Sequence, residues 1–224
     1  MLRLASITAL LNSQAITNDC VVMTTQKSFS LRKLYAAEFL ARGVAGLERL
    51  GFHKANFEGM FHGSDNRGIY APMVRISGQW LEFIDVTFVT SQLTFPIINV
   101  TIGVFDGKVP AIEDLDGVKI IDLIMAAQKM PKTQFQLNRV GWSAFFDKGR
   151  RYEVKKGLSL EETQRQVDRA ISFIIADAVE FEKTRRHHIK RQGVWSIELR
   201  DATLVPKHRI LPKSAAMTAL LASD

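Results

Sequence analysis

One segment near the C-terminal end constrains the fold more than any other, a long amphipathic stretch over residues 159–191. Ser159 and Glu162 form an S-x-x-E capping box, in which each side chain satisfies a free backbone amide at a helix start. Beyond this start, apolar residues recur at three- and four-residue spacing, which makes one buried face. These residues are Val167, Ala170, Ile171, Ile174, Ala178 and Phe181. The segment predicts one long helix packed on a hydrophobic core.

The same helix is expected to end in a cluster of cations that forms the candidate binding site. Its members are Lys183, Arg185, Arg186, Lys190 and Arg191. Residues 183–224 carry nine Lys or Arg against three acids, so they hold +6 of the total net charge of +7. Such asymmetry indicates an anionic partner, either nucleic acid or an acidic protein surface. A solvated helix end favoured by the macrodipole is the alternative interpretation.

The rest of the chain predicts a second helix and several strands. The helix covers residues 31–50, since Ser30 suits its N-cap and Gly51 suits its C-terminal end. Three segments rich in β-branched and aromatic residues are expected to be strands. They cover residues 69–76, 79–90 and 97–104. In the third of them, apolar residues alternate with polar or small ones, which is typical of an antiparallel sheet with one buried face.

Further elements are weaker in their sequence signals. A helix is expected over 113–129, because acids at its start complement the helix dipole. A hairpin follows over 134–154, then a short strand over 194–199 and a last helix over 214–221. The sequence therefore predicts an α+β fold. We expect an antiparallel sheet of about five strands, with the helices over 31–50 and 159–191 packed on one of its faces.

At 224 residues, the chain is expected to form one core domain with appendages. We expect an N-terminal extension over 1–22, a core over 23–192 and a peripheral basic tail over 193–224. No apolar run reaches the roughly 18–20 residues that cross a bilayer, and Cys20 is the only cysteine. An internal disulfide and a cysteine-rich zinc site are therefore excluded. A cytoplasmic location fits this composition, and no cofactor or metal is expected.

Catalytic patterns are scarce in this sequence. It has no Gly-x-Ser-x-Gly elbow and no phosphate-binding glycine-rich loop. Asp85 interrupts an apolar strand, as an acidic residue does in metal-dependent nucleases. The Glu-x-Lys partner of that arrangement is missing, since Glu182 and Lys183 are adjacent. A solvated Asp85 on the wet face of the sheet is the preferred interpretation, and no catalytic residue is assigned.

Short motifs spread over about residues 35–190 resemble a family of small uncharacterised bacterial proteins, described as a domain of unknown function. The motifs are Leu50-Gly51-Phe52-His53-Lys54, Ile98–Val104, Asn138-Arg139-Val140-Gly141, Arg151-Tyr152-Glu153-Val154 and Leu158–Glu162. The chain lacks the paired tryptophans that this family has before its final strand. The resemblance implies an α+β fold, and it implies neither an activity nor functional residues.

Three functions follow as hypotheses. The first is a non-enzymatic binding protein of a phage, plasmid or bacterial accessory locus, whose basic C-terminal region contacts nucleic acid or an acidic protein. The second is a structural or assembly component that forms an oligomer or complex through its tail, with Met217 to Leu221 as an apolar docking helix. The third is a metal-dependent nuclease that uses Asp85.

Overall fold

A computed structural model describes residues 30–89, 95–120, 134–135 and 152–223. Several sequence-based expectations therefore lie wholly or partly outside the described residues. They are the extension over 1–22, the later part of the helix over 113–129, the motif over 138–141 and most of the hairpin over 134–154.

The first helix forms where it was predicted and contains a π-helical turn in its middle. It consists of α1 (Leu31–Glu38), the π-helix η1 (Phe39–Gly43) and α2 (Val44–Glu48). The Ser30 hydroxyl accepts the backbone N–H of Lys33 at 3.4 Å, so the expected N-cap is present. Arg42 pairs with Glu38 on its own helix and with Asp168 of α5 (Leu160–Val179), which ties the two helices together.

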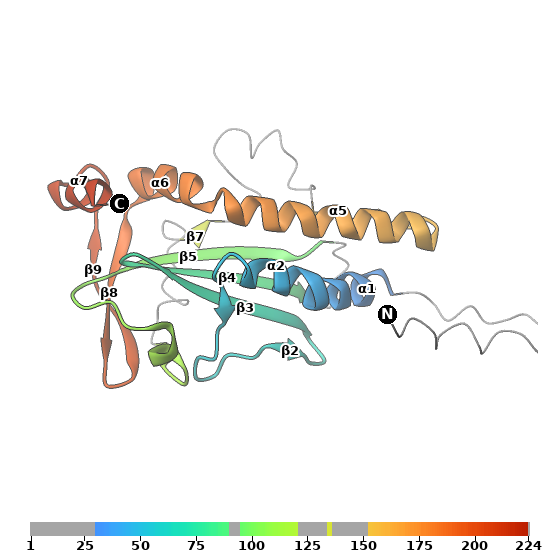
Figure 1. The fold of residues 1–224 in the computed structure, drawn as a ribbon, viewed down its shortest axis with the longest axis horizontal. Helices are drawn as coiled ribbons and strands as arrows, with labels where there is room; N and C mark the ends of the chain where they lie inside the picture. Colours follow the sequence, from blue (N-terminus) through green and yellow to red (C-terminus); the bar gives the residue numbers. More distant parts are fainter. Residues whose placement is uncertain (1–29, 90–94, 121–133, 136–151, 224) are drawn as a thin grey trace, which may run out of the picture.

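The long C-terminal helix is divided at Glu180 into α5 and α6 (Phe181–Gln192). The Ser159 hydroxyl accepts the backbone N–H of Glu162 at 3.2 Å, as the capping box predicts. Both helices lie on the same side of the sheet as α1 and α2 (Figure 1). The predicted arrangement of two main helices is therefore wrong, because the long C-terminal helix is broken at Glu180 and α7 adds a further helix.

The sheet differs from the predicted one in size and in direction. The strands are β1 (His53–Lys54), β2 (Gly63–Ser64), β3 (Gly68–Ser77), β4 (Trp80–Val89), β5 (Ile97–Phe105), β6 (Lys119–Ile120), β7 (Gln134–Phe135), β8 (Val194–Arg200) and β9 (Thr203–Ile210). Their order is β1-β3-β4-β5-β8-β9-β6, with β2 on β3 and β7 on β5. Because β5 pairs with β8 in parallel, and β6 with β9 likewise, the sheet is mixed. The predicted antiparallel sheet of about five strands is wrong.

The sheet curls into a half-barrel whose two edges approach each other. The Lys119 amide donates to the carbonyl oxygen of Ala202 at 3.0 Å, which places β6 beside β9. On its other side, the Glu58 amide donates to the Val118 oxygen at 2.9 Å, and the Gly117 amide donates to the Asn56 oxygen at 2.8 Å. These bonds explain why the helix expected from residue 113 gives way to a 3-10 turn, η2 (Ile112–Leu115), and a strand. The backbone beyond the turn is held in the sheet.

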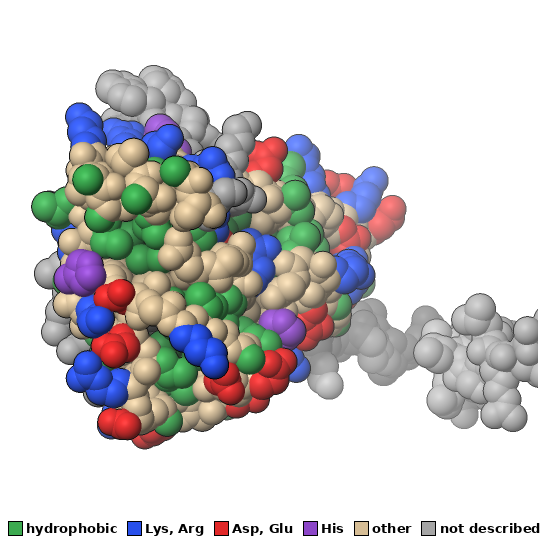
Figure 2. Space-filling view, turned by 60° about the vertical axis from the view of Figure 1, so that its left-hand side comes forward, with side chains coloured by type: hydrophobic (Ala, Val, Ile, Leu, Met, Phe, Trp, Pro, Cys, Tyr) green, Lys and Arg blue, Asp and Glu red, His purple; other side chains and the backbone are tan. Residues whose placement is uncertain are grey.

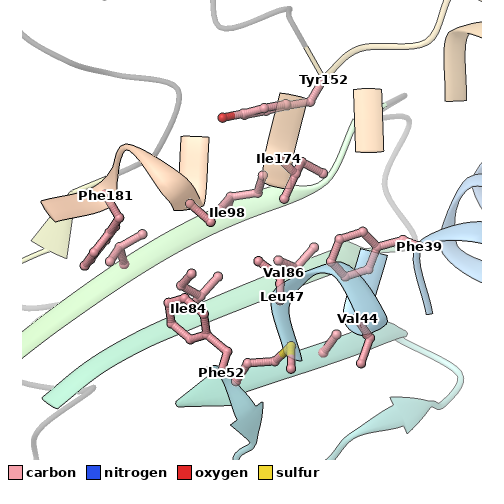
Figure 3. Close-up of a cluster of buried hydrophobic side chains, with 14 of the residues drawn as sticks. Phe39, Val44, Leu47, Phe52, Ile84, Val86, Ile98, Tyr152, Ile174 and Phe181 are labelled. Carbon is pink, nitrogen blue, oxygen red and sulfur yellow. The ribbon is translucent and has the colours of Figure 1, made fainter. Parts of the chain in front are cut away.

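Hydrophobic side chains fill both faces of the curled sheet. On the helix side, Ile174 and Phe181 point toward the strands, and Phe39 and Leu47 come in from the first helix (Figure 3). A second cluster lies inside the curl and takes members from β3, β4, β5, β8 and β9 and from the loops around them. It contains Ala55, Phe57, Val74, Leu81, Phe83, Phe105, Leu115, Val118, Ile197 and Leu204. Since both faces are apolar, β4 is nearly continuously buried, and its period-two alternation is weak.

The residues beyond Gln192 are part of the core, which corrects the expected peripheral tail over 193–224. β8 lies beside β5 in the middle of the sheet, and the expected strand over 194–199 is confirmed within it. The last helix, α7 (Ala215–Ala222), begins at the Ser214 cap and buries Met217 and Leu220 in the helix-side cluster. These two side chains are therefore not an exposed docking surface. Among the described residues, no helix combines the length and the apolar character that a membrane span requires.

Candidate anion-binding surface

The structure divides the predicted cationic cluster into buried and exposed members. Arg185 lies on the buried face of α6, with a side chain only 2% exposed. Its Nη1 donates to Oε1 of Glu82 at 2.6 Å, and Glu82 is 0% exposed. Its guanidinium carbon also lies 4.9 Å from the ring centre of Trp80. The prediction that Arg185 contacts an external anion therefore does not hold, because this charge is neutralised inside the fold.

Glu82 collects a second arginine from the neighbouring strand. Nε of Arg75 donates to Oε2 of Glu82 at 2.7 Å, and its Nη1 donates to the carbonyl oxygen of Leu50 at 2.8 Å. The same guanidinium stacks 4.3 Å from the Phe52 ring centre. Glu82 thus connects β3, β4, α6 and the end of the first helix through one carboxylate. Charge-assisted hydrogen bonds of this kind are shorter and stronger than hydrogen bonds between neutral groups.

Lys190 and Arg191 have the opposite environment, in the last turn of α6. Both side chains are exposed, and neither has a carboxylate at salt-bridge distance within the described part of the chain. The helix ends at Gly193, whose φ of +78° suits glycine and whose amide donates to the Ile189 oxygen at 2.8 Å. A Cβ at Gly193 would lie 2.4 Å from the carbonyl oxygen of Ile210, so glycine also allows α6 to end against β9.

The other two residues of the predicted cluster are not shown as exposed, unpaired cations. The backbone of Lys183 lies in α6, and its side chain is outside the described set. Arg186 is half-buried and has an interaction partner. Of the five predicted site residues, the structure therefore leaves Lys190 and Arg191 as exposed cations.

Cations on the neighbouring hairpin are mostly paired with acids. Nζ of Lys207 lies 2.9 Å from Oδ2 of Asp106 and 3.8 Å from Glu198, which Arg200 also contacts at 3.1 Å. The hydrogen bond from Lys207 lowers the pKa of Asp106, and the carboxylate raises the pKa of Lys207 in return. On the face drawn in Figure 2, acidic and basic side chains are mixed in the lower part, whereas Lys and Arg side chains gather along the upper left edge.

Asp85 does not form the centre that the nuclease hypothesis needs. It is half-buried on β4 and accepts a hydrogen bond from the Thr87 hydroxyl at 2.9 Å. Burial raises its pKa. Asp85 shares its face of β4 with the buried Leu81 and Phe83, so the expected solvated position on a wet face is met only in part. Across the ranges that the structure describes, no group of three or more His, Cys, Asp or Glu is placed to hold a metal ion.

A polar cleft of about 280 Å³ opens beside the end of α2, between β1 and η2. Its polar lining consists of Glu48, His53, Lys54, Asn56, Glu113 and Asp116. Asn56 donates to Asp116 at 3.4 Å, and the lysine lies among three carboxylates. The mixed charge of this lining does not select a ligand of one sign.

No family model, curated protein or solved structure matches this chain. The similarity to a bacterial family of unknown function therefore stays a hypothesis. The site is defined by the geometry of its side chains alone.

Proposed function

We propose that this chain is a non-enzymatic binding protein that contacts a polyanion through the exposed end of α6. The candidate partners are nucleic acid and an acidic protein surface. We place Lys190 and Arg191 at the centre of the contact. A cytoplasmic location belongs to the same proposal, supported by a single cysteine in 224 residues.

One observation carries the proposal: two exposed, adjacent cations without a carboxylate partner among the described residues end α6, in the part of the chain that holds +6 of the net charge of +7. Arg42, Arg165, Arg200 and Lys207 each have a carboxylate partner on the surface. Two adjacent cations at the α6 end have none within the described residues. Neighbouring unpaired cations produce a local positive potential that attracts polyanions and accelerates their association. The helix dipole favours one or two such charges for stability alone, so binding has to be measured directly.

A salt-dependent binding assay tests the proposal. The wild-type chain is titrated into a fluorescein-labelled DNA duplex of about 20 base pairs and, in parallel, into labelled polyglutamate. Affinity is measured between about 50 and 200 mM salt. The variant Lys190→Ala/Arg191→Ala is expected to bind about tenfold more weakly. On the duplex, the negative slope of log affinity against log salt is expected to become less steep by about 1.8. Arg185 stays unchanged in this variant, because its loss would disturb the fold.

The matched control is Lys33→Ala/Arg165→Ala, which removes the same formal charge. Lys33 lies on α1 and Arg165 near the start of α5, at the opposite end of the helical layer from α6 (Figure 1). The control is expected to retain nearly full affinity. Equal losses in the two variants would show that total charge decides binding, and would remove the case for a local surface. The proposal also fails if the wild-type chain binds neither anion.

A further inference from the structure

A tight turn holds a third exposed cation beside the end of α6. Residues Leu211 to Ser214 form a β-turn in which the Ser214 amide donates to the Leu211 oxygen at 3.3 Å. Pro212 is the second residue of the turn, and Lys213 is the third, with φ of +61°. We infer that Lys213 is a phosphate-contacting residue of the same surface, and that the polyanion is a nucleic-acid backbone. This inference rests on the proposed function.

The turn holds Lys213 in a backbone conformation that is unfavourable for a residue other than glycine. With proline second and a positive φ third, the turn matches type II, whose third position takes glycine or asparagine. A side chain with a Cβ is strained in this region. Among the described residues other than glycine, only Asp201 and Ala202 also have a positive φ, and both belong to the β8–β9 turn. Residues held in this region cluster at functional sites, and Lys213, unlike the two hairpin residues, carries an exposed cation there.

The position of the turn supplies that explanation. The backbone of Gly193, at the end of α6, packs against the turn, since a Cβ there would lie 3.1 Å from Cδ of Pro212. Val194 and Ile210 are register partners in the same place. Arg191 precedes Gly193 by two residues, and Lys213 follows Pro212 directly. In Figure 1 the end of α6 and the start of α7 lie close together at the same end of the molecule.

The charge environment of Lys213 matches that of the α6 end. Lys213 is exposed, and no carboxylate lies at salt-bridge distance from it in the described part of the chain. With Lys190 and Arg191, it makes three unpaired cations contributed by two separate segments. Each cation that neutralises a phosphate releases a counterion, so three contacts predict a salt slope near −2.7 on duplex DNA.

The residues around Lys213 favour phosphates over an acidic protein surface. Protein interfaces take most of their affinity from aromatic or large apolar anchors in a desolvated centre. The exposed side of α7 offers small side chains instead, from Ala215, Ala216, Thr218 and Ala219. Leu211, which is 58% exposed, is the one large apolar group of this turn. Charge without a packed centre suits a phosphate backbone, where affinity comes mainly from counterion release.

The test separates the charge of Lys213 from its conformation. Lys213→Gly and Lys213→Asn both remove the cation and replace it with a residue that tolerates a positive φ. Lys213→Gly is expected to raise Tm by about 2 °C. Both variants are expected to bind the labelled duplex about threefold more weakly at low salt, with the slope reduced by about 0.9. Lys33→Ala controls for charge, and Ala202→Gly controls for relief of strain without loss of charge.

The outcomes distinguish this inference from the proposed function. If the wild-type chain binds the duplex and both Lys213 variants bind it equally well, the inference is overturned while the proposed function stands. Binding to polyglutamate without binding to the duplex also overturns the inference and leaves an acidic protein as the partner. A lower Tm in both variants would assign Lys213 to the fold and overturn its role in binding. Weaker duplex binding at unchanged or raised Tm, with neither control affected, supports the inference.

Discussion

The two halves of α6 carry the same kind of residue for opposite purposes. In the first half, Arg185 is buried, ion-paired with Glu82 and stacked on Trp80. In the last turn, Lys190 and Arg191 are exposed, with no acidic partner among the described residues. The difference comes from helical position, because Phe181, Arg185 and Ile189 are spaced four residues apart and share the buried stripe. A run of cations along a helix is therefore not one surface, and its residues must be separated by face before a binding site is assigned.

The strongest way to break this comparison is to remove the buried cation. Arg185→Ala leaves the Glu82 carboxylate with Arg75 as its remaining partner and opens space beside Trp80. Losing one partner of a buried ion pair costs about 3–5 kcal/mol. We expect the free energy of unfolding, measured by urea denaturation, to fall by this amount.

A double-mutant cycle assigns that loss to the pair. Glu82→Ala, Arg185→Ala and the double variant are compared, and the double variant is expected to lose clearly less than the two single losses combined. Additive losses would show that Arg185 stabilises the fold through packing on Trp80 and not through the carboxylate. Lys190→Ala serves as the exposed control in the same helix.

Glu82 and Arg185 also show which structural features can be predicted from the sequence. The capping box, the apolar stripe and the first helix were readable, since each depends on neighbours within four residues. In β4, Glu82 falls between Trp80 and Ile84 on the helix-facing side, while Arg185 continues the apolar stripe of α6. An acid and a base that each interrupt a buried face are candidates for pairing. That signal was present, although the charge run from 183 to 191 obscured it.

The topology was not readable in the same way. The parallel pairing of β5 with β8 joins residues about 90 positions apart, and the edge bonds of β6 depend on Asn56 and Ala202. Local periodicity contains no information about such partners, so the sheet was predicted too small and entirely antiparallel. Residues 193–224 were expected at the periphery for the same reason. The position of β8 in the sheet depends on its pairing with the distant β5.

The two acids of β4, Glu82 and Asp85, extend the comparison between paired and unpaired charges. Glu82 is buried with two guanidinium groups, whereas Asp85 is half-buried with the Thr87 hydroxyl, and burial raises its pKa. A raised native pKa makes the native state hold a proton that the unfolded chain releases. The contribution of Asp85 to the free energy of unfolding is then fully present below the usual carboxyl pKa near 4, and it is lost as the pH rises through the pKa of Asp85 in the native state.

Asp85→Asn is therefore expected to raise the free energy of unfolding at pH 7, by less than Arg185→Ala lowers it. The gain should shrink toward zero below about pH 4, where the wild-type carboxyl is protonated in both states. Urea denaturation of both proteins across this pH range measures the difference. A variant that is less stable at pH 7 would mean that the charged carboxylate has a stabilising partner, and the contrast with Glu82 would disappear.

The smallest expected effect concerns the exposed half of α6. Lys190→Ala/Arg191→Ala removes favourable interactions with the helix dipole, which are worth about 0.3–1 kcal/mol for each exposed charge. We expect the free energy of unfolding to fall by this modest amount at low salt, and the difference to vanish near 1 M salt, where screening is strong. The loss caused by Arg185→Ala should persist at the same salt, because its ion pair is shielded from solvent. If the double variant lost stability equally at both salt concentrations, its side chains would have structural partners, and the two halves of α6 would serve one purpose after all.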